Sequence, residues 1–209
     1  MYDPDADIMP AVKFFERYFP LGAYPDQQKI VAFMQTFIGY CLTRETDQQF
    51  CLVLYGVGSN WKSHIVRIPH DVLGAAICKT LPFECLEKAR GQNNDLLHEA
   101  RHARVVTMEE SNGRGKVNPA TFKNLVCGET ITNKTMYQTK TNFKPVMKLI
   151  FLLNELPEFF INKEFAMQRR TAIINMQTIF VDETKELEKQ LADELRSKGA
   201  PECLMQPNA

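Results

Sequence analysis

Three short, unbroken apolar runs divide the sequence, and each is followed at once by polar residues. They are FCLVLY (residues 50–55), RVVTM (104–108) and KLIFLL (148–153). Runs of this length without polar alternation are typical of strands that are buried on both faces of a parallel sheet. We therefore expect three parallel strands at the centre of the fold.

Around these runs, the sequence predicts helices. In residues 26–42, for example, Ile30, Phe33, Met34 and Phe37 lie at helical spacing. The helices are expected over residues 10–19, 26–42, 94–102, 118–127 and, as a charged helix, 182–197. The first two precede the first strand, so a small helical part opens the chain. Strands that alternate with helices predict an α/β fold with a mostly parallel sheet.

One segment has neither a helical period nor a continuous apolar run. ITNKTMYQTKTNFKPVMK (residues 131–148) combines β-forming residues with a polar centre, which predicts a β-hairpin with its tip at residues 139–142. A last strand or pair of strands is expected over residues 169–180. The chain then divides into an N-terminal helical segment (1–45), a core (46–182) and a C-terminal helix with a tail (183–209).

Composition limits the function classes. The 209 residues are 44% apolar, and 25 basic residues balance 25 acidic ones. Because the net charge is zero, any nucleic-acid contact has to be local. The six cysteines form no C-x-x-C pair, no run reaches the roughly 20 apolar residues of a membrane span, and the N-terminus does not resemble a signal peptide. We expect a soluble cytoplasmic protein with free thiols and no membrane partner.

The first apolar run leads into GVGSNWKSH, which nearly matches the phosphate-binding pattern G-x-x-x-x-G-K-[ST]. Gly56 opens the pattern, and Lys62 and Ser63 close it. Trp61, the only tryptophan, replaces the second glycine. In such a loop the backbone N–H groups and the lysine hold phosphates, and the hydroxyl reaches Mg²⁺.

The other apolar runs end in residues that complete this chemistry. Glu109 and Glu110 follow the second run, and Asn154 follows the third. The carboxyl ends of parallel strands meet at one edge of a sheet, where ligands bind. One carboxylate can hold the metal through water while the other orients the attacking water. Arg169 or Arg170 can neutralise charge in the transition state, often from a neighbouring subunit.

Together these motifs resemble the superfamily 3 helicases, in the primase–helicase branch of large DNA viruses, phages and plasmids. LVLYGVGSNWKS resembles the first motif of that branch, and RVVTMEES resembles the second. FKNLVCGETITNKTMYQTKTNFKPVMKLIFLLNELP resembles the block that carries a DNA-contacting hairpin and a sensor asparagine. RRTAIINMQTIFVDE resembles the closing motif, so the resemblance covers residues 14–182.

The resemblance implies an AAA+-like P-loop ATPase core that binds ATP and Mg²⁺, assembles as a hexameric ring and moves along single-stranded or forked DNA. It also implies a role in replicating a viral or mobile genome, with a primase as partner. The nucleotide would contact Gly56, Gly58, Ser59, Asn60, Lys62 and Ser63. Ser63 and Glu109 would hold the metal. Glu110, the γ-phosphate sensor Asn154 and an arginine finger, Arg170 in preference to Arg169, would act in catalysis.

The predicted hairpin carries a local basic surface. No acid occurs from residue 130 to residue 151, whereas four lysines lie in that segment, with Tyr137 and Phe143 interleaved: Lys134, Lys140, Lys144 and Lys148. Cations and aromatic rings in this arrangement suit a single nucleic-acid strand. Lys134, Lys140 and Lys144 are the candidate DNA contacts, with Lys140 at the expected tip.

The sequence departs from the family pattern at two positions, in the loop and in the helix that follows it. Trp61 adds bulk where the family has glycine, which predicts weaker nucleotide binding. Pro69 lies inside the helix that should follow the loop, so that helix is expected to be short or kinked. A catalytically degenerate module that binds DNA or other subunits is therefore the alternative to an active motor.

A third hypothesis belongs to another class. HEARH (residues 98–102) matches the H-E-x-x-H pattern of zinc hydrolases, with His98 and His102 as ligands and Glu99 as the base. Such a site needs a third ligand, and the sequence beyond this segment offers no convincing one.

Overall fold

The computed structural model describes residues 5–56, 60–87, 95–109, 117–133, 141–161, 165–182, 190, 193–194, 197 and 202–205. The chain forms two compact units. One contains residues 1–37, 57–61 and 176–209, and the other contains residues 38–56 and 62–175. The second unit holds the sheet and most of the candidate site.

A five-stranded parallel sheet, in the order β2-β3-β6-β1-β7, forms the centre of the second unit. Its strands are β1 (Cys51–Tyr55), β2 (Cys78–Pro82), β3 (Val105–Glu109), β6 (Lys148–Leu153) and β7 (Thr171–Asn175). The three apolar runs form the three inner strands, and every residue of β6 is buried. The predicted α/β fold with a mostly parallel sheet is confirmed.

The sequence pattern did not reveal β2. Its sequence, CKTLP, contains a lysine and a proline and alternates only weakly between apolar and polar residues. Proline cannot donate a ladder hydrogen bond, so it is tolerated at a sheet edge. β2 is such an edge strand, which explains why it lacks the continuous apolar character of the inner strands.

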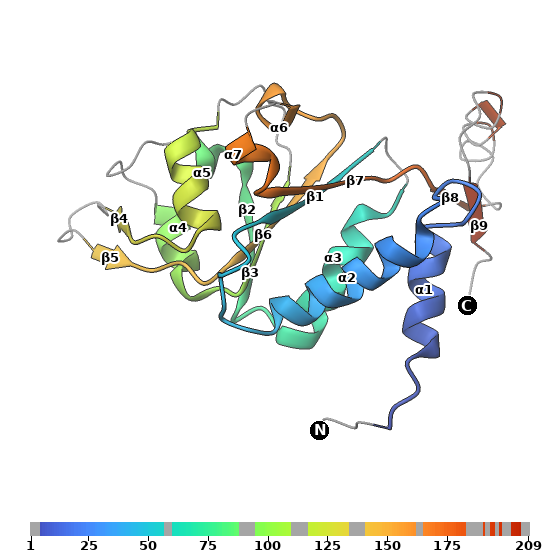
Figure 1. Ribbon diagram of the computed structural model, residues 1–209, viewed down its shortest axis with the longest axis horizontal. Coiled ribbons are helices and arrows are strands. Elements are labelled where there is room, and N and C mark those ends of the chain that lie inside the picture. The colour runs from blue at the N-terminus through green and yellow to red at the C-terminus, as the bar shows by residue number, and fades with distance from the viewer. Residues whose placement is uncertain are drawn as a thin grey trace. The chain divides into compact units, whose positions relative to one another are not determined.

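Helices cover both faces of this sheet (Figure 1). α3 (Lys62–Leu73) lies on one face. α4 (Asp95–Glu99) and α5 (Pro119–Val126) lie on the other, where Phe122 of α5 is fully buried beside Phe151 of β6. α5 begins as predicted, because the Asn118 side chain accepts hydrogen bonds from two backbone N–H groups of the first turn.

Short helices complete this unit. They are η1 (Phe83–Leu86), η2 (Ala100–His102), α6 (Glu158–Ile161) and α7 (Phe165–Gln168). Of the helices that the structure describes, none is long and apolar enough to cross a membrane.

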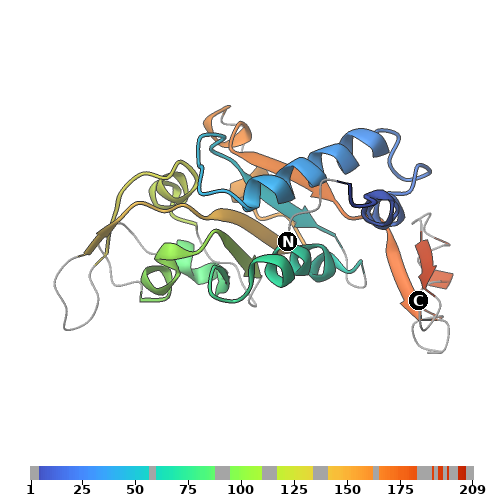
Figure 2. The same ribbon diagram turned by 90° about the horizontal axis from the view of Figure 1, so that it is seen from below.

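A small antiparallel hairpin projects from the sheet unit, as both views show (Figures 1 and 2). β4 (Ile131–Asn133) pairs with β5 (Thr141–Phe143), in the register Ile131 to Phe143. The predicted hairpin is confirmed. Its predicted tip at residues 139–142 is wrong in part, because Thr141 and Asn142 pair within the ladder; residues 134–140 lie outside the described part.

The expected shortening of the helix after the phosphate loop is also wrong. α3 continues for four residues beyond Pro69 and ends at Leu73. Proline removes one backbone hydrogen bond from the helix, which costs about 3 kcal/mol in an exposed helix. Here Pro69 is buried together with Ile65 and Val66, so packing against the sheet holds the helix together through the proline.

The other unit is mainly helical in its N-terminal part. It contains α1 (Met9–Tyr18), which begins one residue before the expected start at Pro10, and α2 (Gln27–Cys41) up to residue 37. β8 (Ile179–Asp182) pairs in parallel with β9 (Glu202–Met205). The Thr178 hydroxyl donates to the Tyr18 carbonyl at 2.8 Å, which ties the segment before β8 to α1.

Candidate nucleotide-binding site

The start of the phosphate loop is fixed to the carboxyl edge of the sheet. β1 ends at Tyr55, and the Gly56 N–H donates to the Leu153 carbonyl at the end of β6, at 3.1 Å. The loop ends where α3 begins, at Lys62. A strand, a loop and a helix therefore follow each other as the pattern predicts. Gly58 and Ser59 lie outside the described residues.

The lysine of the motif is hydrogen bonded to the first residue of the loop. Lys62 is only 8% exposed, and its ammonium group donates to the Gly56 carbonyl at 2.6 Å. A phosphate at this position would offer the ammonium a charged acceptor in place of a neutral carbonyl. Charge-assisted hydrogen bonds are roughly twice as strong as neutral ones, so this side chain fits a phosphate ligand.

The strand ends bring a carboxylate and an amide to the same edge. Glu109 ends β3 and pairs with Leu152 of β6, and Asn154 directly follows β6. Neighbouring strands lie about 4.8 Å apart, so these residues lie close to Gly56 and to the first turn of α3. Ser63, Glu109 and Asn154 are all exposed. Glu110 lies outside the described residues.

An open pocket of about 190 Å³ lies between α3 and the sheet. It is lined by Ser63, Val66, Arg67, His70, Thr80, Thr107, Glu109 and Leu152. A hydroxyl and a carboxylate are the hard oxygen ligands that Mg²⁺ prefers. Pockets for whole small-molecule ligands usually enclose about 300–1,000 Å³, so this one suits a hydrated cation and phosphate oxygens better than an entire nucleotide.

The residue that replaces the motif's glycine keeps a glycine-like backbone. Trp61 has φ +52°, in the left-handed region that bulky residues rarely adopt. Its ring lies 5.4 Å from that of Phe180. Phe180 in turn lies 4.8 Å from Tyr18, so Trp61 joins an aromatic cluster. The preceding Asn60 is buried and donates from its amide to the Met176 carbonyl at 3.2 Å, which gives it a structural contact.

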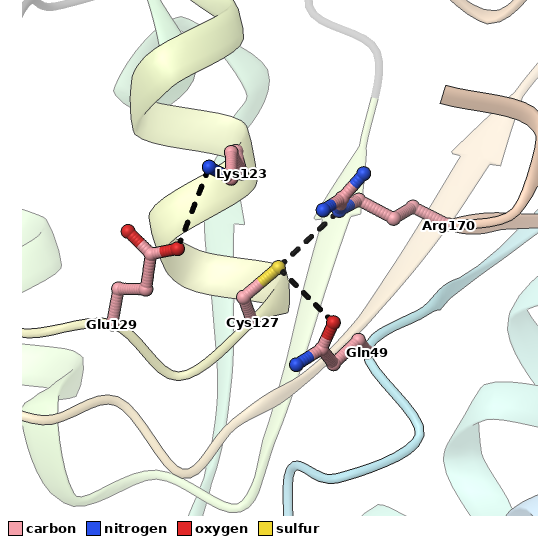
Figure 3. A network of polar contacts seen from close by, with 5 residues as sticks. All are labelled: Gln49, Lys123, Cys127, Glu129 and Arg170. Atoms are coloured by element: carbon pink, nitrogen blue, oxygen red, sulfur yellow. Dashed lines mark hydrogen bonds and ion pairs between the residues drawn. The ribbon is translucent and has the colours of Figure 1, made fainter. Parts of the chain in front are cut away.

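Arg169 and Arg170 lie just before β7 begins, at the amino ends of the strands. The phosphate loop lies at the other, carboxyl ends. Arg169 is exposed, whereas Arg170 is only 5% exposed. Figure 3 shows Arg170 directed at the thiol of Cys127, to which its Nε donates at 3.2 Å. The same thiol lies 3.8 Å from the Oε1 atom of Gln49, which can accept its hydrogen. Arg170 thus connects the C-terminal end of α5 to the start of β7. Arg169 is the one of the two arginines that is exposed.

One predicted DNA-contacting residue lies in the described part. Lys144 is exposed and follows β5, whereas Lys134 and Lys140 lie outside the described residues, as does Tyr137. Phe143 is half-buried, and its ring lies edge-on to His98 at 6.2 Å. Phe143 therefore packs on the sheet unit instead of offering a free face to a base.

The zinc pattern is divided between two kinds of helix. His98 and Glu99 belong to α4, and His102 belongs to the 3₁₀ helix η2. The change from 3.6 to 3.0 residues per turn disturbs the shared face that the H-E-x-x-H pattern needs. Within the ranges given above, no three His, Cys, Asp or Glu side chains are grouped to hold a metal ion.

Sequence reasoning missed one pair of residues at the pocket. His70 hydrogen bonds through Nε2 to the Thr107 hydroxyl at 3.1 Å. His70 follows Ser63 by seven residues, which places both on one face of α3. The seven-residue spacing between Ser63 and His70 was the sequence signal that could have indicated His70 as a residue of the pocket.

No protein-family model matches this chain. A protein of Acanthamoeba polyphaga mimivirus named "Putative helicase L207/L206" is 25% identical over 164 residues, which are 76% of this chain and 17% of that protein. Two solved apo structures of the NrS-1 C-terminal region superpose with TM-scores of 0.59 and 0.58. Their sequences are 14% and 13% identical to this one, over 80% of this chain and 38% of each of theirs.

The chain thus spans well under half of the proteins it resembles. The structural matches establish the fold, and the sequence match adds a distant similarity to a viral protein with a helicase name. The chain is a helicase-like α/β module that carries a variant phosphate loop.

Proposed function

We propose that this chain is the ATP-dependent motor core of a superfamily 3 DNA helicase or translocase. One observation carries the proposal: Lys62, Ser63, Glu109 and Asn154 follow or end elements at the carboxyl ends of one parallel sheet, where Ser63 and Glu109 line a pocket. A phosphate-binding cation, a cation-binding hydroxyl and carboxylate, and a polar amide are what hydrolysis of a nucleoside triphosphate requires.

Each side chain has a role in this proposal. Lys62 would hold the phosphates. Ser63 and Glu109 would hold Mg²⁺, which would supply positive charge to the phosphate oxygens. Glu110 orients the attacking water, and Asn154 binds the γ-phosphate. Gly56, Gly58 and Ser59 supply backbone N–H groups, whereas Asn60 supports the loop through the Met176 carbonyl.

The arginine finger acts on a neighbouring subunit in this proposal. Strands of five residues separate the two edges of the sheet by about 16 Å, so an arginine at the start of β7 is too far from Lys62 of its own chain. Arg169 is exposed and can reach a second copy, whereas Arg170 is buried against Cys127. We therefore assign the finger to Arg169, in a ring that we propose to be a hexamer.

The hairpin supplies the DNA contact in this proposal. Lys144 is exposed at its base, and Lys134 and Lys140 lie between its strands in the sequence. Single-stranded or forked DNA would follow these cations. The setting would be replication of a viral or mobile genome in the host cytoplasm, with a primase as partner.

A degenerate binding module is the second candidate. The left-handed backbone of Trp61, one residue before Lys62, is the observation that favours it. Such a module would keep the hairpin and its DNA contact but would not hydrolyse ATP.

The test is ATPase activity with and without single-stranded DNA, at protein concentrations that permit assembly. We expect turnover that DNA stimulates and that Lys62→Ala abolishes, whereas the exposed Lys13→Ala leaves it unchanged. Turnover that survives Lys62→Ala would contradict the assignment of the loop. DNA binding without turnover in the wild-type chain would establish the binding module instead.

A further inference from the structure

Two polar stripes face each other across the pocket. On α3, Ser63 and His70 are two turns apart on one face, about 10 Å along the helix axis. On β3, Thr107 and Glu109 are two residues apart and therefore point to the same face, about 7 Å apart. All four line the pocket.

The two ends of the pocket differ. At the open end lie Ser63 and Glu109, both exposed. At the other end, His70 and Thr107 close the gap between helix and strand with a hydrogen bond of 3.1 Å. Thr107 is only 2% exposed and His70 is half-buried, so this bond is partly shielded from water.

We propose that the His70–Thr107 pair is a positioning contact that sets the separation between Ser63 and Glu109, and so tunes the site for a divalent cation. α3 and β3 are rigid elements that the His70–Thr107 bond joins at one end of the pocket. A change in their separation at this bond would therefore change the separation of Ser63 and Glu109 at the other end. Octahedral Mg²⁺ accepts only a narrow range of ligand distances, so its binding is sensitive to that spacing. This inference rests on the proposed function, because it concerns the cation that accompanies the nucleotide.

The charge of His70 is consistent with this role. Burial lowers the pKa of His70, and the adjacent Asp71 raises it by a smaller amount. Burial therefore favours the neutral form of the imidazole, which forms the hydrogen bond with Thr107. Thr107 can donate to the ring or accept from it, and Arg67, also at the pocket, is paired with Asp71 at 3.4 Å.

The test separates cation binding from nucleotide binding. Binding of a fluorescent ATP analogue is titrated with Mg²⁺ for the wild-type chain, Thr107→Val and Thr107→Ser. Valine has the shape of threonine without the hydroxyl, and serine keeps the hydroxyl. We expect Thr107→Val to raise the Mg²⁺ concentration for half-saturation about fivefold, the effect of one ordinary hydrogen bond, and Thr107→Ser to raise it less than twofold. Affinity for the analogue without Mg²⁺ should be the same in all three.

A second variant shows whether His70 acts through Thr107. His70→Leu should raise the Mg²⁺ requirement as Thr107→Val does, and the double variant should be no worse than either single one. Equal Mg²⁺ dependence in Thr107→Val and the wild type would overturn the inference and leave the proposed function intact. A wild-type chain that binds no nucleotide at all would overturn both. Thermal unfolding of each variant confirms that the compared chains are folded.

Discussion

At the residue scale, the position before Lys62 shows a conflict between side chain and backbone. Trp61 adopts φ +52°, where a side chain with a Cβ atom is strained by roughly 1–2 kcal/mol. The contact between its ring and Phe180 offsets part of this cost. Position 61 therefore has the left-handed backbone that glycine adopts readily, while it carries a side chain that opposes this conformation.

Substitution of Trp61 tests whether the strain in its left-handed backbone weakens nucleotide binding. Trp61→Gly should tighten nucleotide binding about fivefold or more, because glycine adopts this φ without strain and removes bulk beside the phosphates. Trp61→Ala is the matched control, because it removes the bulk but keeps the Cβ atom. Calorimetric affinities for an ATP analogue measure both. An equal gain in the two variants would assign the effect to bulk and contradict the backbone explanation.

At the element scale, the end of α5 depends on one glycine. Gly128 has φ +63°, and a Cβ atom there would meet the Thr46 hydroxyl and lie 3.3 Å from the Pro145 carbonyl. A left-handed glycine just past a helix end is a common helix stop. Close approach of the segment that leads to β6 makes glycine necessary here for packing as well as for the turn.

Two glycine-to-alanine variants should have opposite effects. Gly128→Ala should lower the free energy of unfolding by about 2 kcal/mol or more, from backbone strain and the clash. Gly39→Ala should raise it by about 0.5–1 kcal/mol, because Gly39 lies inside α2 with open space around it. Urea unfolding of both gives the comparison. A neutral Gly128→Ala would show that the α5 end is not packed as described.

The C-terminal end of α2 is held by a buried lysine. Lys148 is 2% exposed, and its ammonium donates to the Thr43 carbonyl at 2.6 Å and lies 4.6 Å from the centre of the Tyr40 ring. Burial lowers the pKa of Lys148 from 10.5 to about 8. The charged and titratable groups that act on it are Cys41, Glu45, Asp47 and Arg104.

This shift predicts a pH dependence of stability. Between pH 8 and 10.5 the Lys148 side chain of the unfolded protein holds a proton that the folded protein has lost, so the contribution of Lys148 to the free energy of unfolding should rise with pH in this window. The buried thiols of Cys41 and Cys51, whose pKa values are raised, act in the opposite direction above pH 9, so only the difference between the wild type and a Lys148 variant isolates this contribution. Below pH 8 both states hold the proton, and the contribution of Lys148 is constant. Lys148→Met should remove the rise relative to the wild type, whereas the exposed Lys144→Met should keep it. Unfolding curves from pH 7 to 10.5 measure the difference, and parallel wild-type and Lys148→Met curves would contradict the shift.

At the scale of the whole molecule, the sheet separates the two parts of the proposed catalytic machinery. The phosphate loop lies at the carboxyl edge, and Arg169 lies before β7 at the other edge. In the function that we propose, a complete site would therefore take its arginine from a second copy of the chain. Such a heterologous contact would form a ring where the rotation between copies closes.

Mixing two inactive variants tests this arrangement. Lys62→Ala and Arg169→Ala should each abolish ATPase activity alone. In an equal mixture, roughly a quarter of the interfaces combine an intact Lys62 with an intact Arg169, so about a quarter of the activity should return. Lys62→Ala mixed with the exposed-arginine variant Arg44→Ala should instead retain about half of the wild-type activity. A mixture of the first pair that stays inactive would argue against a finger supplied by a neighbour.

The sequence alone determined the inner strands, the N-terminal helices, the hairpin and the loop motif. Local patterns indicate these features: unbroken apolar runs, helical spacing, capping residues and the variant phosphate-loop motif that ends in Trp61, Lys62 and Ser63. Strand β2 was not predictable in this way, because an edge strand needs little apolar character. The length of α3 was not predictable either, because burial of Pro69 offsets a local penalty that the sequence shows plainly.

Only the tertiary structure decided how the candidate residues divide their roles. Arg169 and Arg170 are adjacent and chemically identical, yet the packing of Cys127 buries one and leaves the other exposed. His70 and Thr107 lie 37 residues apart and meet only because α3 crosses β3. Contacts of this kind depend on distances between elements, which no local pattern encodes. The sequence thus determined which chemical groups are present, and packing determined which of them face the pocket.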